Sequence, residues 1–263
     1  MNVIMDADVI AYMAAAGASE TPDIWGDGDG AAVVSQFQDA CHRADELVDG
    51  WLEASECNVD EPKVRLAFSG PSANNFRRGV HPEYKHNRTG EKPEYYHEVV
   101  DYLKQHYGYL QYSNLEGDDI LGMHMGEGWV AVSTDKDMRT VPGHFVRIRV
   151  DGNVNRYNST EADANHFWMF QTLTGDTVDG YKGCPGCGPK GATACLPSVG
   201  ASLSELWHAV VQRYEEAWRK PGPKKKFITG HPEDEALINA RAARILRDGD
   251  YDFDTEEVHL WRP

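Results

Sequence analysis

The segment WVAVSTDKD, residues 129–137, decides the fold class, because an apolar strand in it leads directly into two aspartates. A short apolar run of this kind is typical of a strand buried on both faces of a parallel sheet. Three similar runs, at residues 3–5, 64–68 and 109–112, stand between segments with helical periodicity. Strands that alternate with helices predict an α/β fold, with a mainly parallel central sheet and helices on both faces.

The segments around these runs complete the expected architecture of the 263-residue chain. Residues 144–157 predict a β-hairpin around Asp151-Gly152. Residues 20–32 and 175–191 are rich in Gly, Asp or Pro and predict loops. We expect the remainder of the chain after residue 191 to be mostly helical, with a basic loop and a polar tail. Helical periodicity predicts helices at 35–55, 94–107 and 160–173 and a helix start at 118–125.

Carboxylates follow the predicted strands at the points where the strands end. Asp6 ends the first strand, and Asp135 comes directly after the strand at 129–133. In open parallel sheets, ligands bind beyond the carboxyl ends of the strands, so we expect these side chains to converge. The expected members of this cluster are Asp6, Glu116, Asp118, Asp119, Asp135, Asp137, Asp176 and Asp179.

Converging carboxylates repel one another and raise each other's pKa, so a fold that keeps them together calls for a cation. Oxygen ligands select hard cations, which predicts Mg²⁺ or Mn²⁺. Two such ions can clamp the in-line displacement of a phosphoryl group. Each motif also has a structural interpretation. Asp118 and Asp119 can complement a helix dipole, and Asp8 can cap a helix. Asp135 and Asp176 can shape turns.

The formal charge of −16 weighs against a nucleic-acid partner, because phosphate binding needs positive charge. Positive charge is concentrated locally, however, in residues 76–92 and 213–226. In residues 74–88 basic and aromatic side chains interleave, which suits single-stranded nucleic acid, since cations contact phosphates and rings stack on bases. Arg78 and Tyr84 are the candidate DNA contacts in this segment, and a solvated surface loop is the alternative.

Residues 183–191 read Gly-Cys-Pro-Gly-Cys-Gly-Pro-Lys-Gly and predict a turn between two helices. Exposed backbone amides in such a turn can bind a phosphate, because glycine lets it approach closely. Gly186 and Gly188 provide that access, and Lys182 and Lys190 add positive charge. The segment therefore predicts a second DNA contact.

The chain has five cysteines, an odd and scattered set that argues against a disulfide framework. Cys184 and Cys187 form a CxxC pair, which suggests a thiol redox site or half of a zinc site, with small apolar filler as the structural alternative. No apolar run reaches the ~18 residues that a membrane span needs, and the N-terminus lacks a basic leader. We therefore expect a cytoplasmic protein without a membrane partner.

In their order and spacing, the motifs resemble those of the 5′-3′ exonuclease and flap endonuclease family, in particular its short bacteriophage members. The resemblance covers about residues 1–200. It rests on Ile4-Met5-Asp6, the basic segment at 75–88, Glu116-Gly117-Asp118-Asp119, Ser133-Thr134-Asp135-Lys136-Asp137, Gly175-Asp176-Thr177-Val178-Asp179 and the turn at 183–191.

This resemblance implies a metal-dependent nuclease core of the PIN or 5′-nuclease type at residues 1–174, with a helical arch at about 71–93. Residues 175–263 would form a helix–hairpin–helix DNA-binding region and a helical C-terminus, in one compact unit with the core. The eight carboxylates would hold two metal ions. Lys85 would lie at the scissile phosphate with Arg77 and Arg88 in support, and the hairpin would grip the duplex, around a K⁺ held by main-chain carbonyls.

The implied activity is hydrolysis of phosphodiester bonds in DNA, extending to RNA in RNA–DNA hybrids, in phage DNA replication or genome processing. The products would carry 5′-phosphates. In the family the second strand commonly ends in Asp, whereas Ser69 stands at that place here. This departure keeps open a catalytically impaired DNA-binding protein of the same fold. A zinc or thiol protein built on Cys184 and Cys187 is the second alternative.

Overall fold

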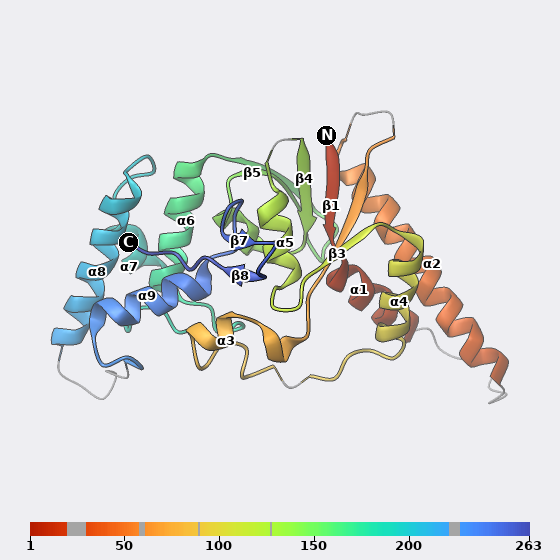
Figure 1. Cartoon of the computed structure of the whole chain (residues 1–263), viewed down its shortest axis with the longest axis horizontal. Coiled ribbons are helices and arrows are strands. Elements are labelled where there is room, and N and C mark those ends of the chain that lie inside the picture. Colours follow the sequence, from red (N-terminus) through yellow and green to blue (C-terminus); the bar gives the residue numbers. More distant parts are fainter. Residues whose placement is uncertain (20–29, 58–60, 89, 127, 221–226) are drawn as a thin grey trace.

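A six-stranded sheet forms the centre of the molecule, shown in Figure 1 as a computed structural model. The structure describes residues 1–19, 30–57, 61–88, 90–126, 128–220 and 227–263. The strand order is β3-β2-β1-β4-β5-β6, and only β6 is antiparallel to its neighbour. The predicted, mainly parallel α/β sheet is thus confirmed. The strands are β1 Asn2–Asp6, β2 Val64–Phe68, β3 Tyr109–Gln111, β4 Trp129–Ser133, β5 Gly143–Ile148 and β6 Val154–Ser159.

Helices cover both faces of this sheet. In β1, Val3 and Met5 point into one core and Ile4 points into the other, as the two-residue period of a strand requires. The first core is closed by α1 Ala7–Ser19, α2 Gly30–Ala54 and α4 Tyr96–His106. The second is closed by α5 Gly117–His124 and by residues from the C-terminal part of the chain, among them Ile245. Because β1 to β5 are parallel, their carboxyl ends lie together at one edge of the sheet, which the helices on the two faces leave open.

A second group of helices lies at one end of the molecule, on the left of Figure 1. Capping boxes begin two of them, with Thr160 and Asp163 at α6 and Ser202 and Glu205 at α8. The third apolar core fills the space between them. The group comprises α6 Glu161–Thr174, α7 Pro189–Cys195, α8 Leu203–Arg219 and α9 Pro232–Ala243.

Most of the residues after Asp252 are exposed, as a polar tail would be, but Trp261 packs against the helical group. The ring of Trp261 lies 4.9 Å from the ring of Trp168 and 5.0 Å from that of Trp207, measured between centroids. A small hairpin precedes it, formed by β7 Tyr251–Asp252 and β8 Glu257–Val258. None of the helices in the described residues combines the length and the apolarity that a membrane span requires.

The segment expected as a helical arch has little regular helix. In its described residues it contains a 3-10 turn, η1 Ser72–Asn74, and a four-residue helix, α3 Arg77–Val80. Helix α3 ends at Val80, and the next residue, His81, has extended dihedral angles because Pro82 follows it. Residues 82–87 form turns. The basic residues expected at 221–226, and most of the loop expected at 20–32, lie outside the described residues.

Candidate active site

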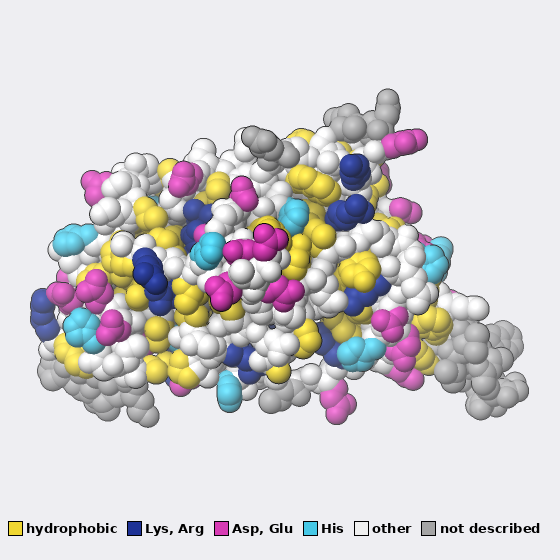
Figure 2. Space-filling model, in the orientation of Figure 1, with side chains coloured by type: hydrophobic (Ala, Val, Ile, Leu, Met, Phe, Trp, Pro, Cys, Tyr) yellow, Lys and Arg dark blue, Asp and Glu magenta, His cyan; other side chains and the backbone are white. Residues whose placement is uncertain are grey.

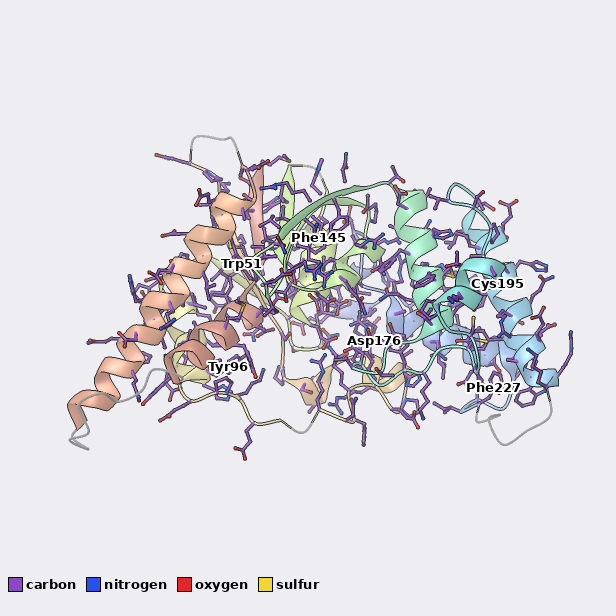
Figure 3. All side chains as sticks on the ribbon, turned by 180° about the vertical axis from the view of Figure 1, so that it is seen from behind. Trp51, Tyr96, Phe145, Asp176, Cys195 and Phe227 are labelled. Carbon is purple, nitrogen blue, oxygen red and sulfur yellow. The ribbon has the colours of Figure 1, made fainter. Side chains whose placement is uncertain are left out.

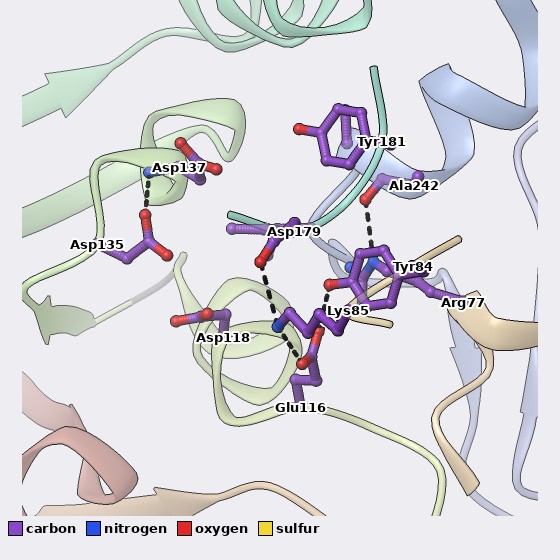
Figure 4. A pocket seen from close by; sticks show the side chains of 12 residues that line it. Arg77, Tyr84, Lys85, Glu116, Asp118, Asp135, Asp137, Asp179, Tyr181 and Ala242 are labelled. Atoms are coloured by element: carbon purple, nitrogen blue, oxygen red, sulfur yellow. Dashed lines mark hydrogen bonds and ion pairs between the residues drawn. The ribbon is translucent and has the colours of Figure 1, made fainter. Parts of the chain in front are cut away.

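Acidic side chains from three segments meet at the edge where the parallel strands end, as Figure 4 shows, and Asp6 of β1 lines the groove beside them. Strand β1 ends at Asp6 and lies between β2 and β4 in the sheet. Asp135 caps the 3-10 helix η2 Lys136–Thr140 directly after β4, and Glu116 caps α5. A small cavity at this edge is lined by Arg77, Tyr84, Lys85, Glu116, Asp118, Asp135, Asp137, Asp179, Tyr181, Ala242, Ala243 and Ile245.

Asp6, Asp118 and Asp135 form the innermost group. Burial and the nearby charge of Asp8 raise the pKa of Asp6 to about 7, although the hydroxyl of Ser133 donates a 2.9 Å hydrogen bond to it. Burial, followed by the charges of Asp6 and Asp135, raises the pKa of Asp118 well above its usual range. Burial also raises the pKa of Asp135. No basic side chain contacts these three carboxylates among the described residues.

Asp137 and Asp176 form a second group, with Lys136 between them. The ammonium of Lys136 lies 3.2 Å from Oδ2 of Asp176 and 3.9 Å from Oδ1 of Asp137. Burial and then the charge of Asp135 raise the pKa of Asp137 to about 7. Asp176 lies on the loop between α6 and α7, and Figure 3 shows it between the helical end of the molecule and the sheet.

Lys85 links Glu116 to Asp179. Its ammonium forms an ion pair with Glu116, lies 3.7 Å from Oδ1 of Asp179, and is itself mostly buried. Its φ of 50° is in the left-handed region, and its backbone amide donates a 2.7 Å hydrogen bond to the carbonyl of Asp179. Burial works to raise the pKa of Glu116, but the cations of Lys85 and Arg77 outweigh it and lower the pKa to about 2. Arg88 contacts Asp179 from the solvent side at 2.7 Å.

Close packing holds Lys85 in this position. A Cβ added at Gly180 would lie 2.4 Å from the carbonyl oxygen of Glu83, so glycine allows the loop after α6 to touch the segment that carries Lys85. Tyr84 is buried and donates a 2.6 Å hydrogen bond from its hydroxyl to Oε2 of Glu116. Its ring is therefore part of the site wall and is not exposed for stacking on a base.

Arg77 and Asp119 form a buried pair beside the cluster. Both guanidinium ends of Arg77 bind Asp119 at 2.6 Å, and the two side chains are 3% and 0% exposed. Asp119 also accepts hydrogen bonds from the amides of Glu116 and Leu246. These four hydrogen bonds fill the four lone-pair sites of a carboxylate, so Asp119 has no lone pair left for a metal ion. Arg77 faces Asp119 and main-chain carbonyls, and not the open groove.

The inner and second groups have the chemistry of a hard-cation site. Among the described residues, no three His, Cys, Asp or Glu side chains are already closed around a point where a metal could sit. Two buried oxygens, Oδ1 of Asp118 and Oδ1 of Asp137, nevertheless have no hydrogen-bond partner. A buried carboxylate oxygen without a partner is costly, and a cation would satisfy it. The carboxylates therefore fit a divalent metal, even though here Lys85 and Lys136 contact some of them.

The remaining predicted DNA contacts lie apart from the cluster. Gly186 and Gly188 are exposed in the turn before α7, Lys190 is exposed in the first turn of that helix, and Lys182 is paired with Glu83 at 2.8 Å. Arg78 donates a hydrogen bond to Ser72 at the surface. The structure thus places one candidate contact surface on the turn and another at the base of the predicted arch.

Cys184 and Cys187 are buried in the helical core at the same turn. A hydrogen bond of 3.0 Å from the amide of Cys187 to the carbonyl of Cys184 closes the turn, with Gly186 at a φ of 73°. The cysteines of the described chain are free thiols. Their burial agrees with the role of small apolar filler that the sequence left open.

Three site residues were not predicted from the sequence. Lys136 stands between two predicted carboxylates, so its place in the motif was a usable signal. Tyr181 lines the cavity, and Tyr96 donates a 3.1 Å hydrogen bond to Asp8. Neither tyrosine has a local signal, because each reaches the site only through the tertiary fold.

Known proteins with similar sequences are phage and bacterial nucleases. The chain is 30% identical over 230 residues to a protein named Exonuclease from Escherichia phage T7, covering 76% of this chain and 74% of that protein. It is 29% identical over 224 residues to Exodeoxyribonuclease of Enterobacteria phage T3, with 76% and 73% covered. It is also 29% identical over 218 residues to Flap endonuclease Xni of Aeromonas salmonicida, with 75% and 78% covered. No family model matches the sequence.

Solved structures with the same fold include two from phage T5. One is the T5 D15 protein co-crystallised with metal ions, with a TM-score of 0.58 and 17% identity over 90% of this chain and 87% of that one. The other is the T5 5′-exonuclease with bound zinc, with a TM-score of 0.55 and 16% identity over 92% and 88%. At these identities the likeness concerns the fold.

Proposed function

Since the chain belongs to the 5′-3′ exonuclease and flap endonuclease family, we propose that it hydrolyses phosphodiester bonds in DNA with the help of divalent metal ions. Its substrates would be duplexes with a 5′ end, flaps or branched DNA, and the RNA strand of RNA–DNA hybrids. The products would carry 5′-phosphates. The observation that supports this proposal best is the convergence of buried carboxylates with unsatisfied oxygens at one edge of the sheet.

We assign two roles to these carboxylates. Asp119 positions Arg77 and fixes the start of α5, because its lone pairs are used by Arg77 and by the amides of Glu116 and Leu246. The other seven would hold two Mg²⁺ or Mn²⁺ ions, which supply charge neutralisation on the phosphoryl group and make water a stronger nucleophile near neutral pH. These seven are Asp6, Glu116, Asp118, Asp135, Asp137, Asp176 and Asp179.

Lys85 would act on the phosphate itself. Its ammonium is held among the carboxylates by Glu116 and Asp179, and both lie beside the cavity. A fixed cation at this place stabilises negative charge that develops on a phosphate during displacement. Arg88 is exposed next to Asp179 and can contact the neighbouring phosphate. Arg77 supports both by holding Glu116 and Asp119 from behind.

The surface suggests which face a duplex approaches. Figure 2 shows acidic side chains gathered at the centre of one face, over β7 and β8. Exposed acids in this hairpin region are Asp248, Asp254, Glu256 and Glu257. This face would repel phosphates, so the exposed turn with Gly186 and Lys190 and the surface at Arg78 are better placed as duplex contacts. A K⁺ at this turn stays a prediction.

Cleavage of end-labelled duplex, flap and hybrid substrates, with and without Mg²⁺, tests the proposal. Asp179→Ala removes a carboxylate that contacts Lys85 and Arg88, so we expect loss of Mg²⁺-dependent cleavage with the unfolding midpoint retained. Asp248→Ala changes an exposed aspartate outside the cluster and should cleave like the wild type. Normal cleavage by Asp179→Ala would contradict the proposal. Binding of flap DNA without hydrolysis in Mg²⁺ or Mn²⁺ would favour the catalytically impaired protein.

A further inference from the structure

The end of strand β2 differs from the ends of its neighbours. β1 ends in a carboxylate and β4 is followed by one, and α5 brings Glu116 and Asp118 to the site after β3. β2 is followed by Ser69 and Gly70, which carry none. A Cβ at Gly70 would lie 2.3 Å from the carbonyl oxygen of Tyr112 and 2.6 Å from that of Ser113, so no side chain fits there.

Asp8, which belongs to α1, brings a carboxylate to the end of β2. It lies in the first turn of α1 but does not cap that helix, because Asp6 accepts the hydrogen bond from the amide of Val9. Asp8 instead reaches across to β2. Its Oδ2 accepts a 2.8 Å hydrogen bond from the amide of Ser69, and its Oδ1 accepts one of 3.1 Å from the hydroxyl of Tyr96. The carboxylate is therefore held at the end of β2.

The position of Asp8 also brings it next to α5. A Cβ added at Gly117 would lie 3.5 Å from its Oδ2, and the hydroxyl of Ser69 accepts a 2.9 Å hydrogen bond from the amide of Gly117. Asp8, Asp6, Asp118 and Asp135 line the same groove. One carboxylate accepts about four hydrogen bonds or ligand bonds, and among the described residues Ser69 and Tyr96 donate two to Asp8. Each oxygen keeps a lone pair for the groove.

We infer that Asp8 is a further metal-holding carboxylate of this site, which supplies from α1 the negative charge that the end of β2 lacks. The amide of Ser69 and the hydroxyl of Tyr96 orient its carboxylate towards the groove. The inference rests on the proposed function, because it adds a residue to the proposed metal site. It also gives a reason why Ser69 is compatible with an active enzyme.

Titration of the DNA-free protein with Mg²⁺ by calorimetry, together with thermal unfolding in EDTA, tests this assignment. Asp8→Asn keeps the size and the hydrogen-bond acceptor but removes the charge. We expect its Mg²⁺ affinity to fall about tenfold or more, as when the support of a metal site is lost. Its unfolding midpoint in EDTA should equal or exceed that of the wild type, because repulsion between Asp8 and Asp6 is relieved. Asp39→Asn, at an exposed position on α2, should leave both values unchanged.

The outcomes separate three cases. Wild-type Mg²⁺ affinity in Asp8→Asn overturns the inference. A lowered unfolding midpoint in EDTA also overturns it, because Asp8 then stabilises the fold through its hydrogen bonds with Ser69 and Tyr96 and does not hold a metal. Recovery of affinity when Ser69→Asp is added to Asp8→Asn supports it, since the carboxylate then returns to the same place on β2. If neither the wild type nor Asp118→Asn responds to Mg²⁺, the proposed metal site itself fails, and the inference fails with it.

Discussion

Replacing Arg77 with Met should destabilise the protein strongly, because it leaves the buried carboxylate of Asp119 without its cation. Arg77 is 3% exposed and its partner Asp119 is 0% exposed. The guanidinium makes two 2.6 Å hydrogen bonds to Asp119, one of 2.5 Å to the carbonyl of Arg244 and one of 3.1 Å to that of Ala242. Methionine has a similar length and can fill the space, but it satisfies none of these oxygens.

The expected size follows from the loss of one partner of a buried ion pair. Such a loss costs about 3–5 kcal/mol, because the remaining charge is left without compensation. For a chain of this size each kcal/mol lowers the unfolding midpoint by about 2–4 °C, which gives a decrease of about 6–20 °C. Arg77→Lys should recover little of it, since a single ammonium cannot reproduce the two-pronged contact.

Thermal and urea unfolding in EDTA measure this effect without any contribution from bound metal. Arg78→Met is the matched control, because Arg78 is the next residue and its guanidinium donates an exposed hydrogen bond to Ser72. It should change the free energy of unfolding by no more than about 0.5 kcal/mol. The double variant Arg77→Met/Asp119→Leu removes both charges and should be more stable than Arg77→Met alone. A loss under about 1 kcal/mol in Arg77→Met would refute the interpretation of this pair as a structural element.

Two further predictions concern the carboxylates and the lysine. The pKa values of Asp6 and Asp137 are raised to about 7 in the metal-free fold. Their protonation stabilises the fold fully below pH 3.8, and this contribution is lost as the pH rises through about 7. Melting in EDTA should thus show lower stability at pH 8 than at pH 6. Mg²⁺ affinity should rise over the same interval with proton release, and a pH-independent affinity would contradict this. Lys85→Met should lower single-turnover cleavage about 10²–10³-fold without weakening Mg²⁺ binding, and unchanged cleavage would exclude its role at the phosphate.

Strands and strand-end acids could be predicted from the sequence because their signals are local. A strand buried on both faces must be an almost continuous apolar run, so β2 and β4 were predicted at the residues where they occur. Asp6 and Asp135 then followed from their position at strand ends. The hairpin predicted at 144–157 is also present. Its signal was Asp151-Gly152, because glycine readily adopts the positive φ that the turn requires, and Gly152 has a φ of 80°.

Tertiary pairing decided what the sequence left open. Arg77 stands in a basic segment and suggested a phosphate contact, but its partner Asp119 is 42 residues away and holds it inside the protein. Tyr84 is buried, although its neighbours suggested a ring for base stacking. Asp8 suggested a helix cap, and only the fold shows that it reaches β2. In each case a polar residue found its partner across the chain, which spacing alone does not reveal.

The distribution of cations divides the acidic cluster into two unequal parts. Lys85, Lys136 and Arg88 contact its outer carboxylates, whereas Asp6 and Asp118 have no basic partner among the described residues. Burial, followed by the charges of neighbouring aspartates, raises the pKa of Asp6 to about 7 and that of Asp118 well above its usual range. A metal ion entering the inner part replaces protons only, while an ion entering the outer part must also displace an ammonium from its carboxylate. The two proposed ions would accordingly bind with different affinities, and removing the ammonium of Lys85 would strengthen the weaker one.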